Sequence, residues 1–168
     1  MSHQPSGNPR IAIIGAGMSG IAAVIKLRKA GYNNITVFEK SEKVGGTWRA
    51  NRYPGLSCDV PSHWYSFTFA PNPDWSHKYS YGPEIQAYME KTAADFDVLS
   101  VCRFNTSVEA LDYIDEQWRL VTQHGDEEIF DIVISATGIL HHPSKPDIAG
   151  LDSFEGKSFH SAEWDMEA

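Results

Sequence analysis

The sequence predicts an α/β fold built around a parallel sheet, and three observations support this prediction. A short apolar, β-branched run at 10–14 leads directly into the glycine pattern GxGxxG at 15–20. Apolar residues then recur at helical spacing over 18–30. A second apolar run at 35–38 ends in Glu39, about 20 residues beyond the glycines. Together they predict the βαβ unit of a Rossmann-like, dinucleotide-binding domain.

Each position of this pattern has a physical task. Gly15 permits a tight turn out of the strand, Gly17 has no side chain to block a pyrophosphate, and Gly20 lets the helix pack close to the sheet. The unpaired N–H groups at the start of the helix face the phosphates. Glu39 can accept both hydroxyls of an adenosine ribose, and its charge repels a 2′-phosphate, so the site favours FAD or NAD over NADP. The alternative is a glycine-rich turn with only a packing role.

Length, charge and cysteine content restrict the class of protein. A chain of 168 residues is long enough for one domain and too short for two full nucleotide-binding domains. Its net charge of −8 argues against nucleic acid or an anionic membrane surface as a partner. Cys58 and Cys102 stand in no metal or redox spacing, and no apolar stretch approaches transmembrane length. We therefore expect a cytoplasmic protein whose residues 1–9 form a flexible tail.

The segment after Glu39 favours a flavin dinucleotide. The glycine pair at 45–46 allows the backbone to approach a ligand closely, Thr47 supplies a hydroxyl, and Trp48 supplies a flat apolar wall. An NAD-dependent dehydrogenase has no special need for this loop, whereas extended FAD needs further elements to hold its riboflavin half. A surface loop with a buried Trp is the alternative.

A long loop at 51–62 contains a candidate functional carboxylate. Pro54-Gly55 is a turn signal, and a loop of this length in a compact domain is usually functional or disordered. Asp59 is the carboxylate of interest, and the alternative is an Asp that caps a turn. Cys58 fits a small buried side chain better than a nucleophile, because no catalytic His is recognisable for it.

The middle of the chain is predicted to hold one helix and several strands. An aromatic run at 63–69 is a short strand or an irregular pocket wall, and an amphipathic helix spans 83–96. Three further strand-like runs resemble an antiparallel excursion inserted into the parallel fold. These runs lie at 101–104, 107–114 and 118–123.

The last strand is predicted at 130–138, as a buried strand of the parallel type. It ends in the small residues Ala136-Thr137-Gly138, which permit close approach of a ligand at the edge of the sheet. His141 and His142 follow, but no acid, Cys or third His is suitably spaced, so we predict no metal site.

Taken in order, these motifs resemble the flavin-containing monooxygenase superfamily. The motifs are GxGxxG at 15–20, Glu39-Lys40, GGTW at 45–48, YPG at 53–55, Asp59 and ATG at 136–138. The segment 154–165 is similar to the fingerprint FxGxxxHxxxW[P/D] of type I Baeyer–Villiger monooxygenases. Every fixed position is filled, by Phe154, Gly156, His160, Trp164 and Asp165. By themselves, these residues would indicate core packing and a hydrogen-bonded histidine.

The resemblance implies an enzyme that binds FAD in its first Rossmann domain and NADPH through a second domain that this chain lacks. The implied reaction uses O₂ and a C4a-peroxyflavin to convert a small-molecule ketone or aldehyde into an ester or lactone, or a thioether into a sulfoxide. The cofactor supplies the difficult chemistry, and the protein supplies orientation and water exclusion. The resemblance implies no nucleic-acid or membrane partner, and it leaves the oligomeric state open.

The resemblance also implies roles for residues at matching positions. The implied cofactor-binding residues are Gly15, Ala16, Gly17, Met18, Ser19, Gly20, Glu39, Lys40, Gly46, Thr47, Trp48, Asp59, Val60, Tyr65, Val108, Ala136, Thr137 and Gly138. Val108 is implied to lie near the adenine through its backbone. Asp59 is implied to position a catalytic arginine, and His160 to act through conformational change in a linker between domains. Asp59 and His160 are therefore the predicted catalytic residues.

The predicted organisation has three parts. They are the tail at 1–9, the FAD-binding Rossmann-like domain at 10–140, and a connector at 141–168 that leads toward the missing NADPH domain. No second glycine motif and no matching catalytic arginine are present. We therefore expect a domain that is incomplete at its C-terminus, inactive alone, and marginally stable because of uncovered apolar surface.

Three alternative functions compete with this interpretation. A heteroatom-oxidising flavin monooxygenase or N-hydroxylase shares the glycines and Glu39, but the filled fingerprint at 154–165 disfavours it. A non-catalytic flavin-binding fragment is supported by the absence of an NADPH motif. A simple NAD-dependent dehydrogenase fits least, because GGTW and the long loop would have no purpose in it.

Overall fold

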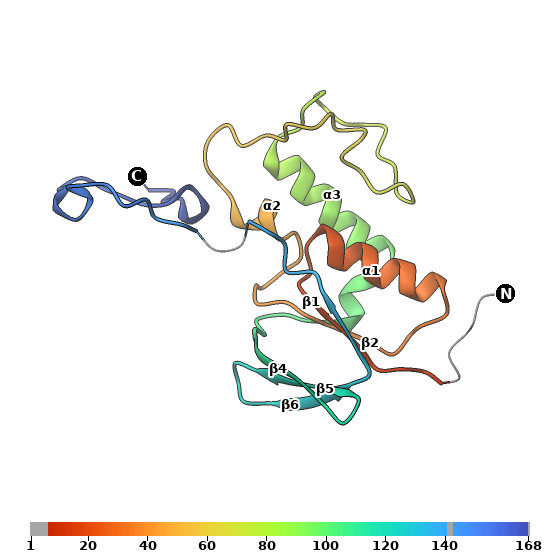
Figure 1. The fold of residues 1–168 in the computed structure, drawn as a ribbon. Coiled ribbons are helices and arrows are strands. Elements are labelled where there is room, and N and C mark those ends of the chain that lie inside the picture. The colour runs from red at the N-terminus through yellow and green to blue at the C-terminus, as the bar shows by residue number, and fades with distance from the viewer. Residues whose placement is uncertain (1–6, 141–142, 168) are drawn as a thin grey trace. The chain divides into compact units, whose positions relative to one another are not determined.

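The fold is described by a computed structural model that covers residues 7–140 and 143–167. Figure 1 shows the course of the chain. The chain divides into two compact units. The first unit extends to Gly46 and includes Met89–Gly138, and the second comprises Thr47–Tyr88 and the residues from Ile139 onward. The start of the expected tail, residues 1–6, and the histidine pair at 141–142 lie outside the described residues.

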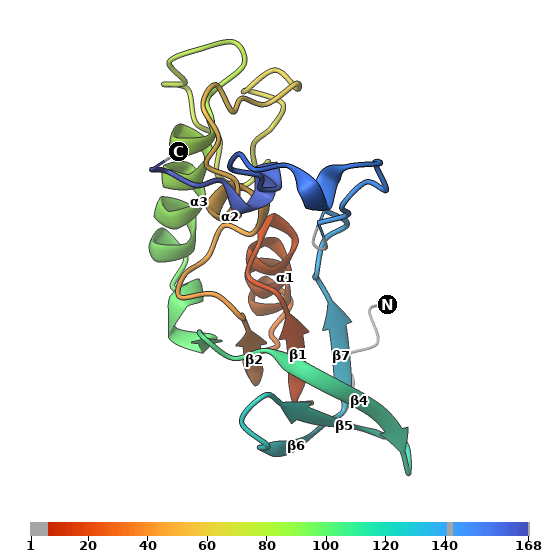
Figure 2. The same cartoon turned by 90° about the vertical axis from the view of Figure 1, so that its left-hand side faces the viewer.

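A parallel sheet with the strand order β3-β2-β1-β7 forms the centre of the first unit. Its strands are β1 (Ile11–Ile14), β2 (Ile35–Phe38), β3 (Cys102–Arg103) and β7 (Ile132–Ser135). Helix α1 (Met18–Lys29) connects β1 to its parallel neighbour β2, and Figure 2 shows β2, β1 and β7 side by side. This arrangement confirms the predicted βαβ unit.

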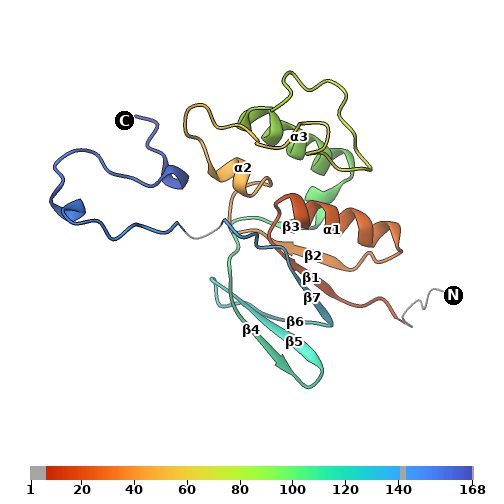
Figure 3. The same cartoon turned by 45° about the horizontal axis from the view of Figure 1, so that its top comes forward.

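The two faces of this sheet are covered by different elements. Side chains alternate between faces along a strand, so Ala12, Phe38 and Val133 lie on one face and Ile11, Ile13 and Val37 on the other. Helix α1 lies on one side of the strands, and a second sheet lies on the opposite side (Figure 3). Ala12 and Phe38 belong to the core cluster that this second sheet completes.

The second sheet is the predicted antiparallel excursion. Its strands, in the order β4-β5-β6, are β4 (Val108–Ile114), β5 (Gln117–Thr122) and β6 (Glu127–Phe130). Leu120 and Phe130 are buried against the parallel sheet, and the rings of Phe130 and Phe38 meet edge to face with centroids 5.8 Å apart.

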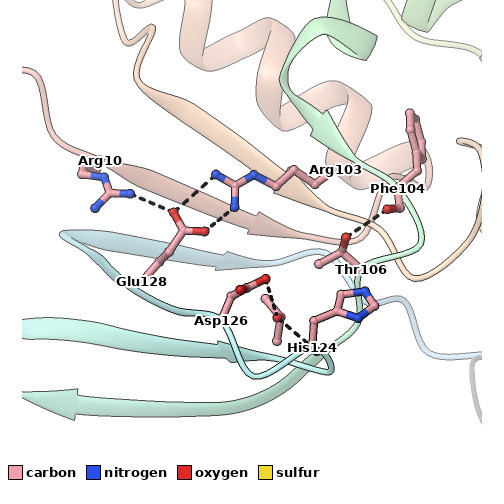
Figure 4. Close-up of polar contacts among 8 residues, drawn as sticks. Arg10, Arg103, Phe104, Thr106, His124, Asp126 and Glu128 are labelled. Atoms are coloured by element: carbon pink, nitrogen blue, oxygen red, sulfur yellow. Dashed lines mark hydrogen bonds and ion pairs between the residues drawn. The ribbon is translucent and has the colours of Figure 1, made fainter.

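One carboxylate joins the two sheets (Figure 4). Glu128 on β6 pairs with Arg10 at 3.0 Å and with Arg103 on β3, and its side chain is only 18% exposed. The Arg10 guanidinium lies over the Phe130 ring at 4.8 Å, and that of Arg103 lies over the Phe38 ring at 5.4 Å. Polar and aromatic contacts thus fix the same junction.

The second unit contains little regular structure. It contains α2 (Thr47–Ala50), two 3₁₀ turns, η2 (Leu151–Ser153) and η3 (Ser161–Glu163), and the first part of α3 (Gly82–Asp95), which ends in the first unit. The Tyr88 hydroxyl donates to the Ala70 carbonyl at 2.7 Å and accepts from the Phe67 amide at 2.8 Å. These bonds fix the aromatic run at 63–69, which is irregular and not a strand.

Two strand predictions were wrong in their details. The predicted strand at 130–138 is two strands, because the chain passes from β6 to β7 at Asp131, where that carboxylate accepts a hydrogen bond from the Arg10 amide at 2.7 Å. β7 is an edge strand, so it is not fully buried, and Ile132 is 41% exposed. The run at 101–104 contains only β3, which pairs with β2 in the parallel sheet instead of joining the excursion. It is preceded by a 3₁₀ turn, η1 (Val98–Val101).

Within the described ranges, no helix combines the length and the apolar character needed to cross a membrane.

Candidate functional site

The glycine loop begins where β1 ends, and Gly15 makes its first turn. Gly15 has φ +101°, and its amide donates to the Phe38 carbonyl at 2.8 Å. A Cβ at this position would lie 2.6 Å from the Ala136 carbonyl oxygen at the end of β7. Only glycine fits here, because both the backbone conformation and the contact with Ala136 exclude a side chain.

The N-terminus of α1 is unblocked. Gly17 is its N-cap residue and supplies no side-chain hydrogen bond, and the first turn contains no acidic residue. The amide groups of this turn are therefore available to an anion, and the helix dipole favours negative charge there. The basic residues of α1 lie in its last turn, where they complement the opposite end of the dipole.

Gly20 and Gly46 allow close backbone packing around this helix end. A Cβ on Gly20 would lie 2.0 Å from the Gly15 carbonyl oxygen, so the loop folds directly onto the first turn of α1. We predicted that Gly20 brings the helix close to the sheet, but its tightest neighbour is the loop itself. A Cβ on Gly46 would lie 3.1 Å from the Gly17 Cα, so these two glycines face each other.

Glu39 fixes the glycine loop to the end of β2. Its side chain is buried, with 6% of the residue exposed. One carboxylate oxygen accepts from the Ala16 amide at 2.7 Å, and the other accepts from the Ser41 amide at 2.9 Å. Each oxygen has a further lone pair. Glu39 can therefore accept a ribose hydroxyl while it holds the loop in place.

Cys102 lies near this carboxylate and stays a neutral thiol at ordinary pH. Burial, and then the negative charge of Glu39, raise the pKa of the Cys102 thiol from 9.0 to about 11. The Cys102 thiol is also within 3.4 Å of the Val98 carbonyl. Its position indicates a packing role, because reactive cysteines have a lowered pKa.

The end of β7 and the start of β4 lead to four further predicted residues of the first unit, Ala136, Thr137, Gly138 and Val108. Ala136 donates its amide to the Ile14 carbonyl at 2.8 Å, which keeps the end of β7 beside the glycine loop. Thr137 and Gly138 follow and are exposed. Val108 begins β4, which is an edge strand of its sheet.

The second unit brings Trp48 and Tyr65 together. The Trp48 indole nitrogen donates to the Tyr65 hydroxyl at 2.9 Å, and the two rings meet edge to face at 5.6 Å. Burial raises the pKa of Tyr65, the bond from Trp48 opposes this shift, and the Cys58 thiol and the Asp59 carboxylate add to it. Asp59 itself is exposed. These residues form a small group of aromatic and acidic side chains.

The fingerprint segment has its own local structure within the second unit. The His160 Nδ1 accepts from the Ala162 amide at 3.0 Å and thereby caps η3. The Trp164 ring meets the Phe159 ring edge to face at 5.0 Å and contacts the Tyr53 ring at 6.5 Å.

The predicted residues thus fall into two groups. The first unit contains the glycine loop, Glu39, Lys40, Gly46, Val108 and residues 136–138, and the second contains Thr47, Trp48, Asp59, Val60, Tyr65 and His160. The predictions missed Ser41, whose amide binds Glu39. They also missed Gly45 as a site residue, although its amide donates to the Ala16 carbonyl at 3.1 Å. The adjacent glycines at 45–46 are a sequence signal that could have included Gly45 in the site, whereas no sequence signal marks Ser41.

In the part of the chain that the structure describes, no group of three or more His, Cys, Asp or Glu side chains is placed to hold a metal ion.

Comparison with known proteins identifies relatives of this arrangement. Residues 13–89 match the family described as an NAD(P)-binding Rossmann-like domain. A Baeyer-Villiger monooxygenase of Streptomyces coelicolor is 48% identical over 158 residues, which cover 93% of this chain and 30% of that protein. A Baeyer-Villiger monooxygenase of Pseudomonas aeruginosa is 41% identical over 171 residues, which cover 98% and 32%.

Solved structures agree with these relatives. The crystal structure of the OTEMO complex with FAD and NADP has a TM-score of 0.86 and 37% identity, and the match covers 95% of this chain and 31% of that one. Cyclohexanone monooxygenase bound to ε-caprolactone has a TM-score of 0.86 and 36% identity, with 95% and 32% covered. The chain therefore spans about a third of the length of the relatives it matches. As its motifs predicted, the chain is homologous to the N-terminal part of the Baeyer–Villiger monooxygenases.

Proposed function

We propose that this chain binds FAD as the FAD-binding part of a monooxygenase that uses NADPH and O₂ to insert oxygen next to a carbonyl group. The observation that carries the proposal is the unblocked N-terminus of α1 beside the buried carboxylate of Glu39. These two groups match the pyrophosphate and the adenosine ribose of a dinucleotide.

The described residues fit the phosphate-binding half of the cofactor. Gly17 and Gly46 face each other at the start of α1, and neither places a side chain there. The Ala16 peptide is fixed on both sides, because its amide donates to Glu39 and its carbonyl accepts from Gly45. A pyrophosphate would therefore meet amides that are already oriented, and binding would cost little reordering of the loop.

Several features support FAD over NAD as the occupant. The OTEMO structure, which this chain resembles, is a complex with FAD and NADP, and another relative, from Aspergillus terreus, is named an FAD-binding monooxygenase. The Trp48–Tyr65 pair provides an apolar, hydrogen-bonded wall of the kind that a flavin ring requires. We assign Thr47, Trp48, Asp59, Val60 and Tyr65 to the riboflavin half, and Lys40, Val108 and residues 136–138 to the rest of the cofactor.

Bound FAD would supply the oxygen chemistry, and the chain would bind, orient and shield it. We propose a ketone or aldehyde as the substrate, with an ester or lactone as the product. A related cyclohexanone monooxygenase has been solved with ε-caprolactone, a lactone, bound. Asp59 and His160 are proposed to act in catalysis by positioning other groups. The cytoplasmic location expected from the sparse cysteines is part of the same proposal.

FAD retention tests this proposal. The purified chain is mixed with FAD, passed through a gel-filtration column, and examined for a bound flavin absorption band, and FAD is then titrated by fluorescence quenching. Glu39→Gln removes the charge and places an amide NH₂ group against a backbone N–H. We expect it to weaken FAD binding at least about tenfold, because a hydrogen bond to a charged group is lost.

The matched control is Glu116→Gln, at the exposed turn between β4 and β5 in the same unit. This variant should bind FAD as the parent chain does. If the folded parent chain retains no flavin, or if both variants bind FAD equally well, the proposed site is wrong.

A further inference from the structure

The backbone segment at 103–107 runs alongside the residues that would bind the ribose. The Glu39 amide donates to the Arg103 carbonyl at 3.0 Å, and the Thr106 amide donates to the Glu39 carbonyl at 2.9 Å. The Asn105 amide donates to the Ser41 carbonyl at 2.9 Å. The group next to the ribose in an adenine dinucleotide is the adenine ring, so this segment is placed to form its wall.

Asn105 has a left-handed backbone conformation. Its φ is +52°, in a region that asparagine adopts more readily than most other non-glycine residues. Next to it, the Thr106 hydroxyl donates to the Phe104 carbonyl at 2.9 Å (Figure 4).

Gln123, directly after β5, binds this segment through three hydrogen bonds. Its side-chain nitrogen donates to the Asn105 carbonyl at 2.9 Å, and its side-chain oxygen accepts from the Ser107 amide at 3.2 Å. Its own amide donates to the Ser107 carbonyl at 2.9 Å. One residue thus binds the peptide groups on both sides of Thr106. The ring of His124 also lies 3.3 Å from the Asn105 carbonyl.

These bonds also set the direction of the Val108 peptide groups. Hydrogen-bonded and non-hydrogen-bonded residue pairs alternate along two antiparallel strands. The Gln123 amide donates to the Ser107 carbonyl, so the next pair, Val108 with Thr122, is a non-hydrogen-bonded pair of β4 and β5. The Thr122 amide donates to the Asp126 carbonyl instead, in the turn toward β6. The Val108 amide and carbonyl therefore point out of the free edge of β4, where a purine edge can use them.

We propose that Gln123 is a positioning residue for the adenine half of the bound dinucleotide. It shapes the segment at 105–108 so that the Val108 peptide groups face the adenine, and it does not contact the cofactor itself. This inference rests on the proposed function, because it assumes an adenine dinucleotide at Glu39. It adds a determinant of affinity that lies outside the glycine motif.

The test compares two probes, ADP and inorganic pyrophosphate, titrated into the chain and followed by NMR chemical shifts. Gln123→Leu removes both side-chain hydrogen bonds at similar size. We expect it to weaken ADP binding about fivefold, as the loss of one or two hydrogen bonds implies. Pyrophosphate binding should stay unchanged, because the hydrogen bonds of Gln123 go to the segment at 105–107 and to His124. A general loss of structure would weaken both probes.

Gln117→Leu is the matched control, since Gln117 lies at the opposite end of β5 and donates to Asp131 at 3.2 Å. It should bind ADP as the parent chain does. If Gln123→Leu does not fold, Gln123→Glu provides the second test, because it keeps the acceptor for Ser107 and loses the donor to Asn105. A folded Gln123 variant with the ADP affinity of the parent chain overturns the inference alone. A parent chain that binds neither FAD nor ADP overturns the proposed function and this inference with it.

Discussion

The substitution Gly20→Ala tests how tightly the glycine loop is built onto α1. An alanine Cβ at this position would lie 2.0 Å from the Gly15 carbonyl oxygen and 3.0 Å from the Gly15 carbonyl carbon. Real Cβ atoms essentially never approach closer than 3.0 Å. The loop and the helix must therefore separate, because a backbone carbonyl cannot rotate away as a side chain can.

Neither side of this contact can move easily. On the helix side, Ile21, Val24 and Ile25 are buried. On the loop side, Gly15 and Ala16 are bonded to Phe38 and Glu39. Forcing extra volume into such packing costs about 3 kcal/mol. At about 2–4 °C of melting temperature per kcal/mol for a chain of this size, Gly20→Ala should lower the midpoint by about 6–12 °C.

Gly17→Ala provides the contrast, because it adds the same methyl group three residues earlier. Its Cβ would lie 3.6 Å from the Gly46 Cα, an ordinary contact, and Gly17 has φ −76°, which alanine adopts. We expect a change in stability of about 1 kcal/mol or less, the size of an N-cap effect. FAD affinity should nevertheless fall at least about tenfold, because the methyl group occupies the approach of the pyrophosphate.

Thermal unfolding followed by circular dichroism, together with FAD titration of both variants, checks this pair. The two substitutions should separate stability from binding. The reasoning is refuted if Gly20→Ala melts within 2 °C of the parent chain, a shift of about 1 kcal/mol or less, or if Gly17→Ala binds FAD as tightly as the parent.

Two further predictions concern other parts of the first unit. Glu128→Gln should lower the free energy of unfolding by about 1–3 kcal/mol in urea titrations, because it removes the carboxylate that Arg10 and Arg103 share. The control is Glu127→Gln, because the Glu127 carboxylate pairs with Arg119 at the surface. This variant should change the free energy of unfolding by less than about 1 kcal/mol. Cys102 should make the chain lose stability as pH rises from 9.0 to about 11, because the folded state keeps the thiol protonated above its ordinary pKa. Cys102→Ala should remove that part of the slope, and an unchanged slope would show that the thiol is not the cause.

The first βαβ unit could be predicted from the sequence because its signals are local. The strand at 11–14, the glycines and the helix from Met18 follow one another directly, and each glycine has a conformational or packing reason. The break between β6 and β7 could not be predicted in this way. It depends on a hydrogen bond from the Arg10 amide to Asp131, residues that are 121 positions apart.

The sequence predicts which residues belong to the candidate site, but it does not predict which hydrogen bonds join them. Spacing predicts that Glu39 binds a ribose, but it does not show that the same carboxylate accepts from the Ala16 and Ser41 amides. Gln123 has no motif around it, and its role depends on a peptide 16 to 18 residues earlier. Glu39 and Gln123 both bind backbone groups that have no partner in a helix or sheet. Only the tertiary structure determines which backbone groups these are.

The structure shows what several fixed residues of the fingerprint at 154–165 contact. A Cβ on Gly156 would lie 2.5 Å from the Phe154 ring, so a side chain there would displace this exposed ring from its place over the backbone. The His160 Nδ1 accepts a hydrogen bond, so a neutral ring carries its proton on Nε2 and presents a donor from the start of η3. Trp164 contacts Tyr53, which belongs to the YPG motif, so two motifs far apart in the sequence meet in one unit. These contacts give the fingerprint segment a local structure of its own, in which the His160 ring is held at the start of η3.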